Sequence, residues 1–364
     1  MGLEHVDAAE VGMDAGRLNR LGSVLDAAVA EGVFPAATLC VVRRGRIAWQ
    51  SAHGAILGGA PARPDTIFDL ASLTKPHTAL ALLRLVEKGC VSLTAPVGEF
   101  LPEARPALAR VTIRQLATHT AGLVPWAPLY ARAPGKDAML REILSIPLAS
   151  VPGERYAYSD LGYILLGEIV ERVAGASLAD ALRTEVLDPL GMRDTGFLPD
   201  ASAQARIAPT ANCPQRPGRI LVGEVHDANA HFYGGVAGHA GLFGSATDLA
   251  ILAAALLDGG VCGGRCFLGA PTLSLVRRNA LPNDLGGQSI GWFTHPNGML
   301  PRGDLLSDEA FGHTGFTGTL LVCDPRYGLA VALLTNRVMN PADNGAVQAV
   351  RRRVLNVTAS AIVE

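Results

Sequence analysis

The spacing of apolar residues near the N-terminus predicts a helix followed by a hairpin. Leucines, valines and alanines recur at helical intervals in RLNRLGSVLDAAVAEG (17–32), where Asp14 is placed to cap the helix and Gly32 to end it. Two apolar runs rich in β-branched residues follow, ATLCVVRR (37–44) and RIAWQSA (46–52), joined around Gly45. This part of the chain therefore predicts a helix and the first two strands of an antiparallel sheet.

The pattern changes after residue 72, where helical spacing dominates. Helical patterns lie at 76–88, 112–118, 137–146, 161–174 and 177–187. Thr112 and Gln115 form a T-x-x-Q capping box, and Ser177 is placed to cap the last of these helices. The stretch 198–240 is rich in Pro, Gly and Ala with little periodicity, which favours loops around a cleft.

Strand patterns return in the C-terminal part of the chain. A helix over DLAILAAALLDGG (248–260) begins at Ser245 or Thr247, and strands are predicted at 289–295, 317–325 and 329–337, before a last helix at about 341–359. Strands at both ends with helices between them predict an α/β (α+β) fold. We expect a sheet lobe built from 1–70 and 240–364, with a mainly helical lobe, 71–239, inserted into it.

Composition and charge narrow the classes of function. Of the 364 residues, 49% are apolar and 18% are charged, which is typical of a globular protein. Because 31 Lys and Arg nearly balance 33 Asp and Glu, the chain has no net electrostatic field that would attract nucleic acid. A small-molecule or peptide substrate suits this charge balance better. The basic run 351–353 lies in a helical pattern, and we interpret it as a solvated face.

The chain contains no membrane-spanning signal, because no segment approaches the ~20 consecutive apolar residues that a helix needs to cross a bilayer. Its N-terminus carries acidic residues where a secretory signal is basic and apolar, so the sequence as given predicts a cytoplasmic location. A periplasmic or secreted location stays open for a chain whose signal peptide has been removed. Oligomeric state is not indicated.

The six cysteines are scattered, and most read as buried thiols. Cys262 and Cys266 are the one close pair. A single C-x-x-x-C without a second pair supports neither zinc nor a disulfide strongly, so a bond between these two stays open.

The first chemical signal is the segment DLASLTKPH (69–77). It places Ser72 at a helix start and Lys75 three residues later, so that both side chains lie on one face. A serine hydroxyl becomes a good nucleophile when a neighbouring base takes its proton, and a lysine can do so if its pKa is lowered. By itself, S-x-x-K is also typical of a helix-capping serine beside a surface lysine.

Two further elements follow in order, Tyr158-Ser159-Asp160 and His313-Thr314-Gly315. S-x-x-K, then Y-x-N, then K-T-G or H-T-G is the ordered signature of penicillin-recognising serine hydrolases. With tyrosine heading the second element, the chain resembles the branch that holds class C β-lactamases, related DD-peptidases and β-lactamase-like carboxylesterases. The stretches that carry the resemblance are 116–123, 151–175, 188–197, 234–250 and 311–318.

This resemblance implies a β-lactamase/DD-peptidase-like fold and a role for each motif residue. Ser72 would be the acylated nucleophile, Lys75 the group that deprotonates it, and Tyr158 a phenolate or proton relay. His313, Thr314 and Gly315 would lie on the strand that edges the cleft. The backbone N–H groups of Ser72 and Phe316 would form the oxyanion hole. No cofactor or metal is implied.

The chain departs from the family pattern at two positions. Asp160 stands where Asn is usual, so an amide donor becomes a carboxylate that can pair with Lys75. His313 replaces the lysine of K-T-G, so a permanent cation becomes a group expected to titrate near neutrality. We therefore expect hydrolysis of an ester or a D-amino-acid peptide or amide through an acyl-enzyme. The alternatives are a true class C β-lactamase and a slowly deacylating penicillin-binding or sensor protein.

Other motifs compete with this interpretation. Gly287-Gln288-Ser289-Ile290-Gly291 matches the G-x-S-x-G nucleophile elbow, but a strand before it and a helix after it are not predicted. We interpret His119, in THTAGL, as a turn-stabilising residue. A cluster of acids and histidines in one loop admits a metal site, but without H-E-x-x-H or paired C-x-x-C a structural role is favoured. Its members are Glu224, His226, Asp227, His231 and His239.

Overall fold

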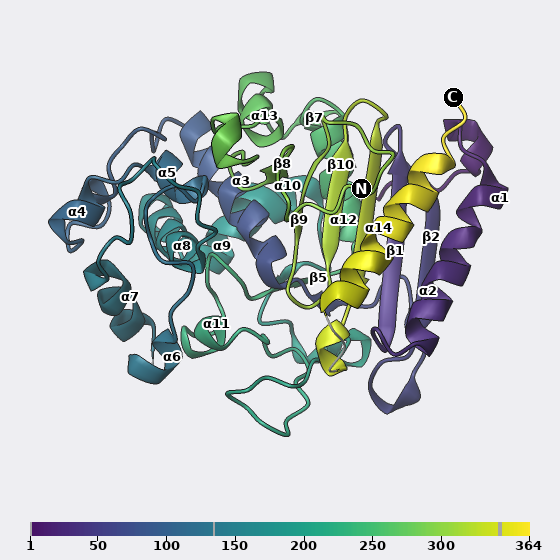
Figure 1. The fold of residues 1–364 in the computed structure, drawn as a ribbon, viewed down its shortest axis with the longest axis horizontal. Coiled ribbons are helices and arrows are strands. Elements are labelled where there is room, and N and C mark those ends of the chain that lie inside the picture. Colours follow the sequence, from purple (N-terminus) through teal and green to yellow (C-terminus); the bar gives the residue numbers. More distant parts are fainter. Residues whose placement is uncertain (1, 134, 341–343) are drawn as a thin grey trace.

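The centre of the molecule is a six-stranded antiparallel sheet in the order β2-β1-β11-β10-β9-β8 (Figure 1). The computed structural model describes residues 2–133, 135–340 and 344–364. The N-terminal hairpin extends the sheet beside the C-terminal strands, with β2 at the edge, because β1 pairs with β11 from Ala37 opposite Thr335 to Arg43 opposite Leu329. The strands of this sheet are β1 (Ala36–Arg43), β2 (Arg46–Gly54), β8 (Phe293–Thr294), β9 (Phe311–Thr314), β10 (Leu320–Asp324) and β11 (Leu329–Thr335).

Helices cover both faces of the sheet, which explains why β1 and β11 are buried throughout and mainly apolar. Alternate residues of β1 point to opposite sides: Leu39 and Val41 pack in one core, and Cys40 and Val42 in the other. The first core lies under α2 (Arg20–Ala30) and α14 (Asn344–Ser360), which contact each other (Figure 1). The second lies under α12 (Ala246–Leu257).

The helical part of the chain is organised around α3 (Thr74–Glu87), which packs against α8 (Asp160–Ala174) and is buried along most of its length. A helix normally exposes one face, so this burial marks α3 as the central helix. The remaining helices are α1 (Ala15–Leu18), α4 (Pro106–Ala109), α5 (Ile113–Ala117), α6 (Leu129–Arg132), α7 (Lys136–Ser145), α9 (Leu178–Leu182), α10 (Asp188–Leu190), α11 (Ala228–Phe232) and α13 (Ala270–Arg277).

Two smaller sheets complete the fold. One has the order β3-β5-β4, and its strand β3 leads directly into the turn before α3. The other is the hairpin β6-β7. The strands are β3 (Phe68–Asp69), β4 (Gly196–Phe197), β5 (Leu242–Gly244), β6 (Val261–Cys262) and β7 (Arg265–Cys266). The fold is the mixed helix and antiparallel sheet expected, while the lobe boundaries at 71 and 240 stay a prediction.

Local capping predictions agree with the structure. Asp14 accepts a hydrogen bond from the backbone N–H of Arg17, although the N-terminal helix is divided at Asn19 into α1 and α2. The capping box of Thr112 and Gln115 is present at α5. The pattern at 177–187 gives α9 followed by a π-helical turn over 183–187. Of the last predicted helix, residues 341–343 lie outside the described residues, and α14 accounts for the remainder.

The strand predicted at 289–295 is wrong, because only Phe293 and Thr294 join the sheet, as β8. Gly291 has φ +89°, and a Cβ there would lie 2.3 Å from that of Ala79, so the backbone turns where only glycine fits against α3. Apolar composition alone did not reveal this turn.

The solvated face predicted for 351–353 is wrong at its first residue. Arg351 is 2% exposed, and its guanidinium donates to the carbonyls of Gly315 at 3.0 Å and Thr319 at 2.7 Å. Arg352 and Arg353 are exposed, as expected. Helix α14 thus directs one arginine beneath the connection between β9 and β10.

The cysteines are free thiols, and Cys262 lies opposite Arg265 rather than Cys266 in the β6-β7 hairpin. Cys262 and Cys266, whose pairing the sequence left open, therefore form no disulfide in this structure. In the part of the chain that is described, no helix combines the length and the apolar character required to cross a lipid bilayer.

Candidate active site

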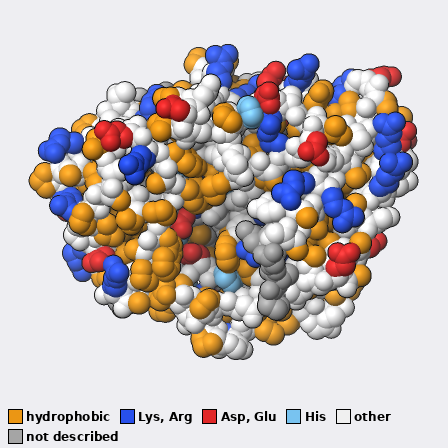
Figure 2. Space-filling model, viewed as in Figure 1, with side chains coloured by type: hydrophobic (Ala, Val, Ile, Leu, Met, Phe, Trp, Pro, Cys, Tyr) orange, Lys and Arg blue, Asp and Glu red, His pale blue; other side chains and the backbone are white. Residues whose placement is uncertain are grey.

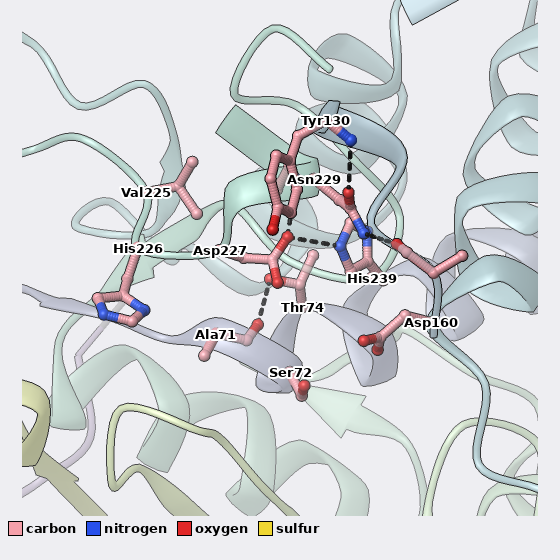
Figure 3. Close-up of polar contacts among 12 residues, drawn as sticks. Ala71, Ser72, Thr74, Tyr130, Asp160, Val225, His226, Asp227, Asn229 and His239 are labelled. Carbon is pink, nitrogen blue, oxygen red and sulfur yellow. Dashed lines mark hydrogen bonds and ion pairs between the residues drawn. The ribbon is translucent and has the colours of Figure 1, made fainter. Parts of the chain in front are cut away.

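Ser72 lies in a 3₁₀ turn that leads into α3. The residue before it, Ala71, has φ +49°, a left-handed conformation that costs a residue with a Cβ about 1–2 kcal/mol. Two hydrogen bonds hold this conformation. Asp69 Oδ1 accepts from the Ala71 N–H at 2.8 Å. The Ala71 carbonyl accepts from the Thr74 hydroxyl at 2.7 Å, a contact drawn in Figure 3. The backbone therefore holds Ser72 in a sharp turn at the helix start.

Lys75 joins three segments that are far apart in sequence. Its Nζ lies 3.0 Å from Ser72 Oγ, 3.0 Å from the carbonyl oxygen of His239 and 2.7 Å from Asp160 Oδ1. Its side chain is 0% exposed, whereas that of Asp160 is 20% exposed. Ser159 caps α8 by accepting from the Gly162 N–H, which places Asp160 in the first turn, facing α3. The pairing of Asp160 with Lys75 that the sequence allowed is present.

The charge on Lys75 follows from this surrounding. Burial lowers its pKa, but Asp160 and Tyr158 outweigh burial and hold the pKa above its usual value. Lys75 is therefore an ammonium at neutral pH and donates to Ser72. The lowered pKa that a lysine base requires is not met in the resting state.

Tyr158 lies over the same cluster. Lys75 Nζ is 4.9 Å from the centre of its ring, and the phenol hydroxyl is within hydrogen-bonding reach of Lys75 and Ser72. Burial raises the pKa of Tyr158, and the Lys75 charge offsets only part of that effect, so the resting phenol is neutral. Tyr158 can therefore pass a proton between Ser72 and Lys75 without carrying charge at rest.

His119 supports Tyr158 from behind. Its ring packs on that of Tyr158, with 4.5 Å between ring centres, and its Nδ1 accepts from the Ser159 N–H at 3.0 Å. The backbone of His119 has φ +58°, and burial lowers its pKa well below the usual range. It stabilises a turn, as expected, and it also holds the Y-S-D segment in place.

His313 is a neutral residue in this site. It lies on β9, its ring stacks on Phe293 with 4.2 Å between ring centres, and its Nδ1 donates to the Thr314 carbonyl at 2.8 Å. Burial, followed by the Lys75 charge, lowers its pKa to about 3. The expected titration near neutrality is therefore wrong, because the ring is enclosed rather than presented to solvent.

Ser72 opens into a cavity of about 430 Å³. Figure 2 shows a hollow at the centre of this face with acidic side chains inside it. Among the described residues that line it there are two carboxylates and no lysine or arginine. The lining residues are Ala71, Ser72, Trp126, Tyr158, Asp160, Pro214, Gln215, His226, Asp227, Ala228, His239, Ala240, Phe316 and Thr317.

The predicted residues of the third motif separate into two groups. Phe316 lines the cavity with Ser72, which is the placement that a shared oxyanion hole requires. The Gly315 N–H donates to the Thr319 carbonyl at 2.8 Å and shapes the connection between β9 and β10. His313 and Thr314 are not among the described lining residues.

The second carboxylate of the cavity, Asp227, pairs with His239. His239 Nε2 lies 3.0 Å from Asp227 Oδ1, which also accepts from the Ala230 N–H at 2.8 Å (Figure 3). Burial raises the pKa of Asp227, but His239 and this backbone bond outweigh burial and bring the pKa to about 2. The backbone carbonyl of His239 also accepts a hydrogen bond from Lys75 Nζ. The Asp227–His239 pair therefore fixes one wall of the site. The described residues contain no group of three side chains suited to a metal ion.

The rival nucleophile, Ser289, has a different surrounding. It is 0% exposed, and its hydroxyl donates to the Val276 carbonyl at 2.6 Å. A turn and β8 follow it, not the helix that a nucleophile elbow needs. Its contacts are those of a structural serine.

Comparison with known proteins places this geometry in a family. A family model described as Beta-lactamase matches residues 21–355. The chain belongs to the β-lactamase family. One relative, from Salmonella agona (strain SL483), bears the provisional name D-alanyl-D-alanine carboxypeptidase and is 30% identical over 93% of this chain and 87% of its own. A second, the N-acetylmuramyl-L-alanine amidase of Bacillus subtilis (strain 168), is 31% identical over 90% of this chain and 83% of its own.

Solved structures share the fold of this β-lactamase-family chain. EstCE1, a hydrolase with promiscuous acyltransferase activity, has a TM-score of 0.77 at 24% identity and covers 93% of this chain and 98% of its own. The class C β-lactamase of Rhodobacter sphaeroides has a TM-score of 0.75 at 23% identity and covers 95% of this chain and 100% of its own. Family and relatives together make the protein a serine hydrolase of the β-lactamase family.

Two site residues were missed by sequence reasoning. Asp69 and Arg351 bind the backbone around Ser72 and Gly315, respectively. A buried side chain that hydrogen-bonds to the backbone has no sequence motif, because a residue from any segment of the chain can make such a bond. The one available signal was the position of Asp69 three residues before Ser72.

Proposed function

We propose that the protein hydrolyses an ester or a D-amino-acid peptide or amide through an acyl-enzyme on Ser72. The observation that carries this proposal is the 3.0 Å contact between Ser72 Oγ and the buried Nζ of Lys75, at the wall of a cavity large enough for a small substrate. The named activities of the two relatives, a carboxypeptidase and an amidase, are both acyl transfers to water from an amide bond.

The reactive form is the one in which Lys75 has lost a proton. Its amine then takes the hydroxyl proton of Ser72 while Oγ bonds to the substrate carbonyl carbon. Tyr158, within reach of both groups, relays that proton to the leaving alcohol or amine as the carbonyl–leaving-group bond breaks. A water molecule then attacks the acyl-enzyme, gives its proton to the same cluster and releases Ser72.

The negative charge that develops on the carbonyl oxygen needs donors that are already in place. The N–H groups of Ser72 and Phe316 would supply them, and Arg351 holds the loop of Phe316 through the Gly315 and Thr319 carbonyls. Backbone donors work for esters and amides alike, so this feature supports the reaction class rather than one substrate.

The charges of the cavity support a neutral acyl portion. The lysine of K-T-G, which would receive a substrate carboxylate, is replaced by the neutral His313, and Asp160 and Asp227 face the cavity. An anionic acyl group would meet two carboxylates there. A peptide loses its terminal carboxylate with the leaving amine, but a β-lactam keeps its carboxylate on the acyl group when the ring opens. We therefore expect β-lactams to be poor substrates of Ser72.

The test is a panel of four substrates: p-nitrophenyl butyrate, N-acetylmuramyl-L-alanine, a D-Ala-D-Ala peptide and nitrocefin. We expect turnover of the ester or of one amide in the wild type, none in Ser72→Ala, and slow nitrocefin turnover. Turnover retained in Ser72→Ala overturns the proposal. Intact mass after nitrocefin exposure tests the sensor alternative, since a stable adduct without turnover of any ester or amide would favour it.

A further inference from the structure

The structure assigns to Asp69 the role of a positioning residue that aligns the nucleophile, one cavity wall and the oxyanion loop with one another. This inference rests on the proposed function of Ser72. Asp69 touches none of the reacting atoms, but it makes three contacts with the backbone and loops around them.

The first contact fixes the nucleophile. Asp69 Oδ1 accepts from the Ala71 N–H at 2.8 Å, and Ala71 is the left-handed residue that immediately precedes Ser72. A residue with a Cβ stays in that conformation only when its surroundings determine it. Asp69 and Thr74 hold the two backbone polar groups of Ala71, Asp69 at the N–H and Thr74 at the carbonyl.

The second contact fixes the opposite wall. Asp69 Oδ2 accepts from the His226 N–H at 2.7 Å. His226 precedes Asp227, and both line the cavity. One carboxylate therefore binds two segments, one through each oxygen: the turn at Ala71, 2 positions from Asp69, and the loop at His226, 157 positions from it.

The third contact fixes the oxyanion loop. The backbone carbonyl of Asp69 accepts from the Thr317 hydroxyl at 2.7 Å, and Thr317 follows Phe316. The next carbonyl, that of Leu70, accepts from Thr319 at 3.0 Å. The two proposed oxyanion donors, at Ser72 and Phe316, are thus held at a set separation through Asp69 and Leu70.

The chemistry of the site explains why a carboxylate is needed. Asp69 is 2% exposed, so no bulk water replaces a lost bond, and an ionised carboxylate can accept at both oxygens. Burial raises its pKa to about 6. Since that value lies above the unfolded pKa, the ionised form at neutral pH makes folding less favourable than the protonated form does.

The test compares Asp69→Asn with Asp248→Asn. Asparagine keeps the shape but turns an N–H₂ toward one of the two backbone donors, so one bond is lost. Asp248 is a matched control, because it is also buried, accepts from the Asp194 N–H at 2.8 Å and the Thr195 hydroxyl at 2.9 Å, and has its pKa raised to about 6, yet does not line the cavity.

The readouts are the rate of Ser72 labelling by a fluorophosphonate, kcat and KM on p-nitrophenyl butyrate, and the thermal midpoint. For Asp69→Asn we expect labelling and kcat to fall by about 100-fold with KM within about threefold, because misalignment by ~1 Å has such an effect on the reacting geometry. For Asp248→Asn we expect labelling and kcat to stay within about twofold of the wild type, even if the thermal midpoint falls.

Equal labelling of the wild type and a folded Asp69→Asn overturns the inference, and so does an equal loss of kcat in Asp248→Asn. If Asp69→Asn does not fold, Thr317→Val replaces it, with an expected fall in labelling of about tenfold, and unchanged labelling there overturns the inference. Absence of labelling in the wild type, or labelling retained in Ser72→Ala, contradicts the proposed function instead.

Discussion

Two serines of this chain lie in short motifs that are typical of hydrolases, and their surroundings differ in every property that chemistry needs. Ser72 lines a cavity and has the Lys75 ammonium 3.0 Å from its oxygen. Ser289 is enclosed, and its hydroxyl is used by the carbonyl of Val276. Both motifs are short. The comparison shows that a nucleophile is defined by an accessible oxygen, a partner able to move its proton and a place for the carbonyl.

The largest difference should appear in covalent labelling. A fluorophosphonate should modify Ser72 alone, so that Ser72→Ala loses labelling by more than about 1,000-fold, since removal of a catalytic serine lowers kcat on the order of 10⁶-fold. Ser289→Ala should be labelled at the wild-type rate. Peptide mass mapping locates the adduct. An adduct on Ser289 would contradict the assignment of Ser72 as the nucleophile.

Tyr158→Phe tests the partner that moves the proton. It removes only the hydroxyl that reaches Ser72 and Lys75, while the ring packing on His119 remains. We expect kcat for p-nitrophenyl butyrate to fall by about 100-fold, the usual contribution of a proton-transfer group, with KM nearly unchanged. Steady-state kinetics measure this split. The matched control is Tyr156→Phe, because the ring of Tyr156 packs on the same histidine. The kcat of this variant should change by less than about threefold.

Asp160→Asn tests the charge that separates this chain from the usual Y-x-N pattern. Activity requires neutral Lys75, so kcat/KM should rise with pH as its ammonium loses a proton. Asp160 raises the pKa of Lys75 and burial lowers it. Without the carboxylate that pKa falls, and the rising limb of the profile should move to lower pH by about one unit or more.

A pH profile of kcat/KM from pH 5 to 10 measures that shift. Asp227→Asn is the control, because Asp227 lies in the same cavity but is bonded to His239 rather than to Lys75, and its shift should be smaller. A limb that stays in place or moves to higher pH in Asp160→Asn would contradict Lys75 as the base.

Ser289→Ala should have the smallest effect on catalysis. Its kcat should stay within about twofold of the wild type, while the free energy of unfolding falls by about 1 kcal/mol through the lost buried hydrogen bond. Denaturant titration measures the second quantity. A large loss of kcat without loss of stability would mean that Ser289 takes part in the reaction.

Sequence patterns predicted much of this fold because local physics determines them. The hairpin of β1 and β2, the capping box at Thr112 and the helix behind Ser72 each depend on residues close together in the chain. The strand at 289–295 failed, because contact between Gly291 and Ala79 is not local. The ordered motifs also pointed to the family, which the match over residues 21–355 shows.

The charges of the site were decided by the tertiary structure. Sequence identified Lys75 and His313 and allowed Asp160 to pair with Lys75, but it predicted neither that this ion pair keeps Lys75 protonated nor the burial that keeps His313 neutral. Nor did it reveal that Asp69 and Arg351 hold the loops around Ser72. Residue order determined which groups the chain contains and which local turns hold them. Their protonation and alignment depend on burial and on neighbours distant in sequence, so only the folded molecule sets them.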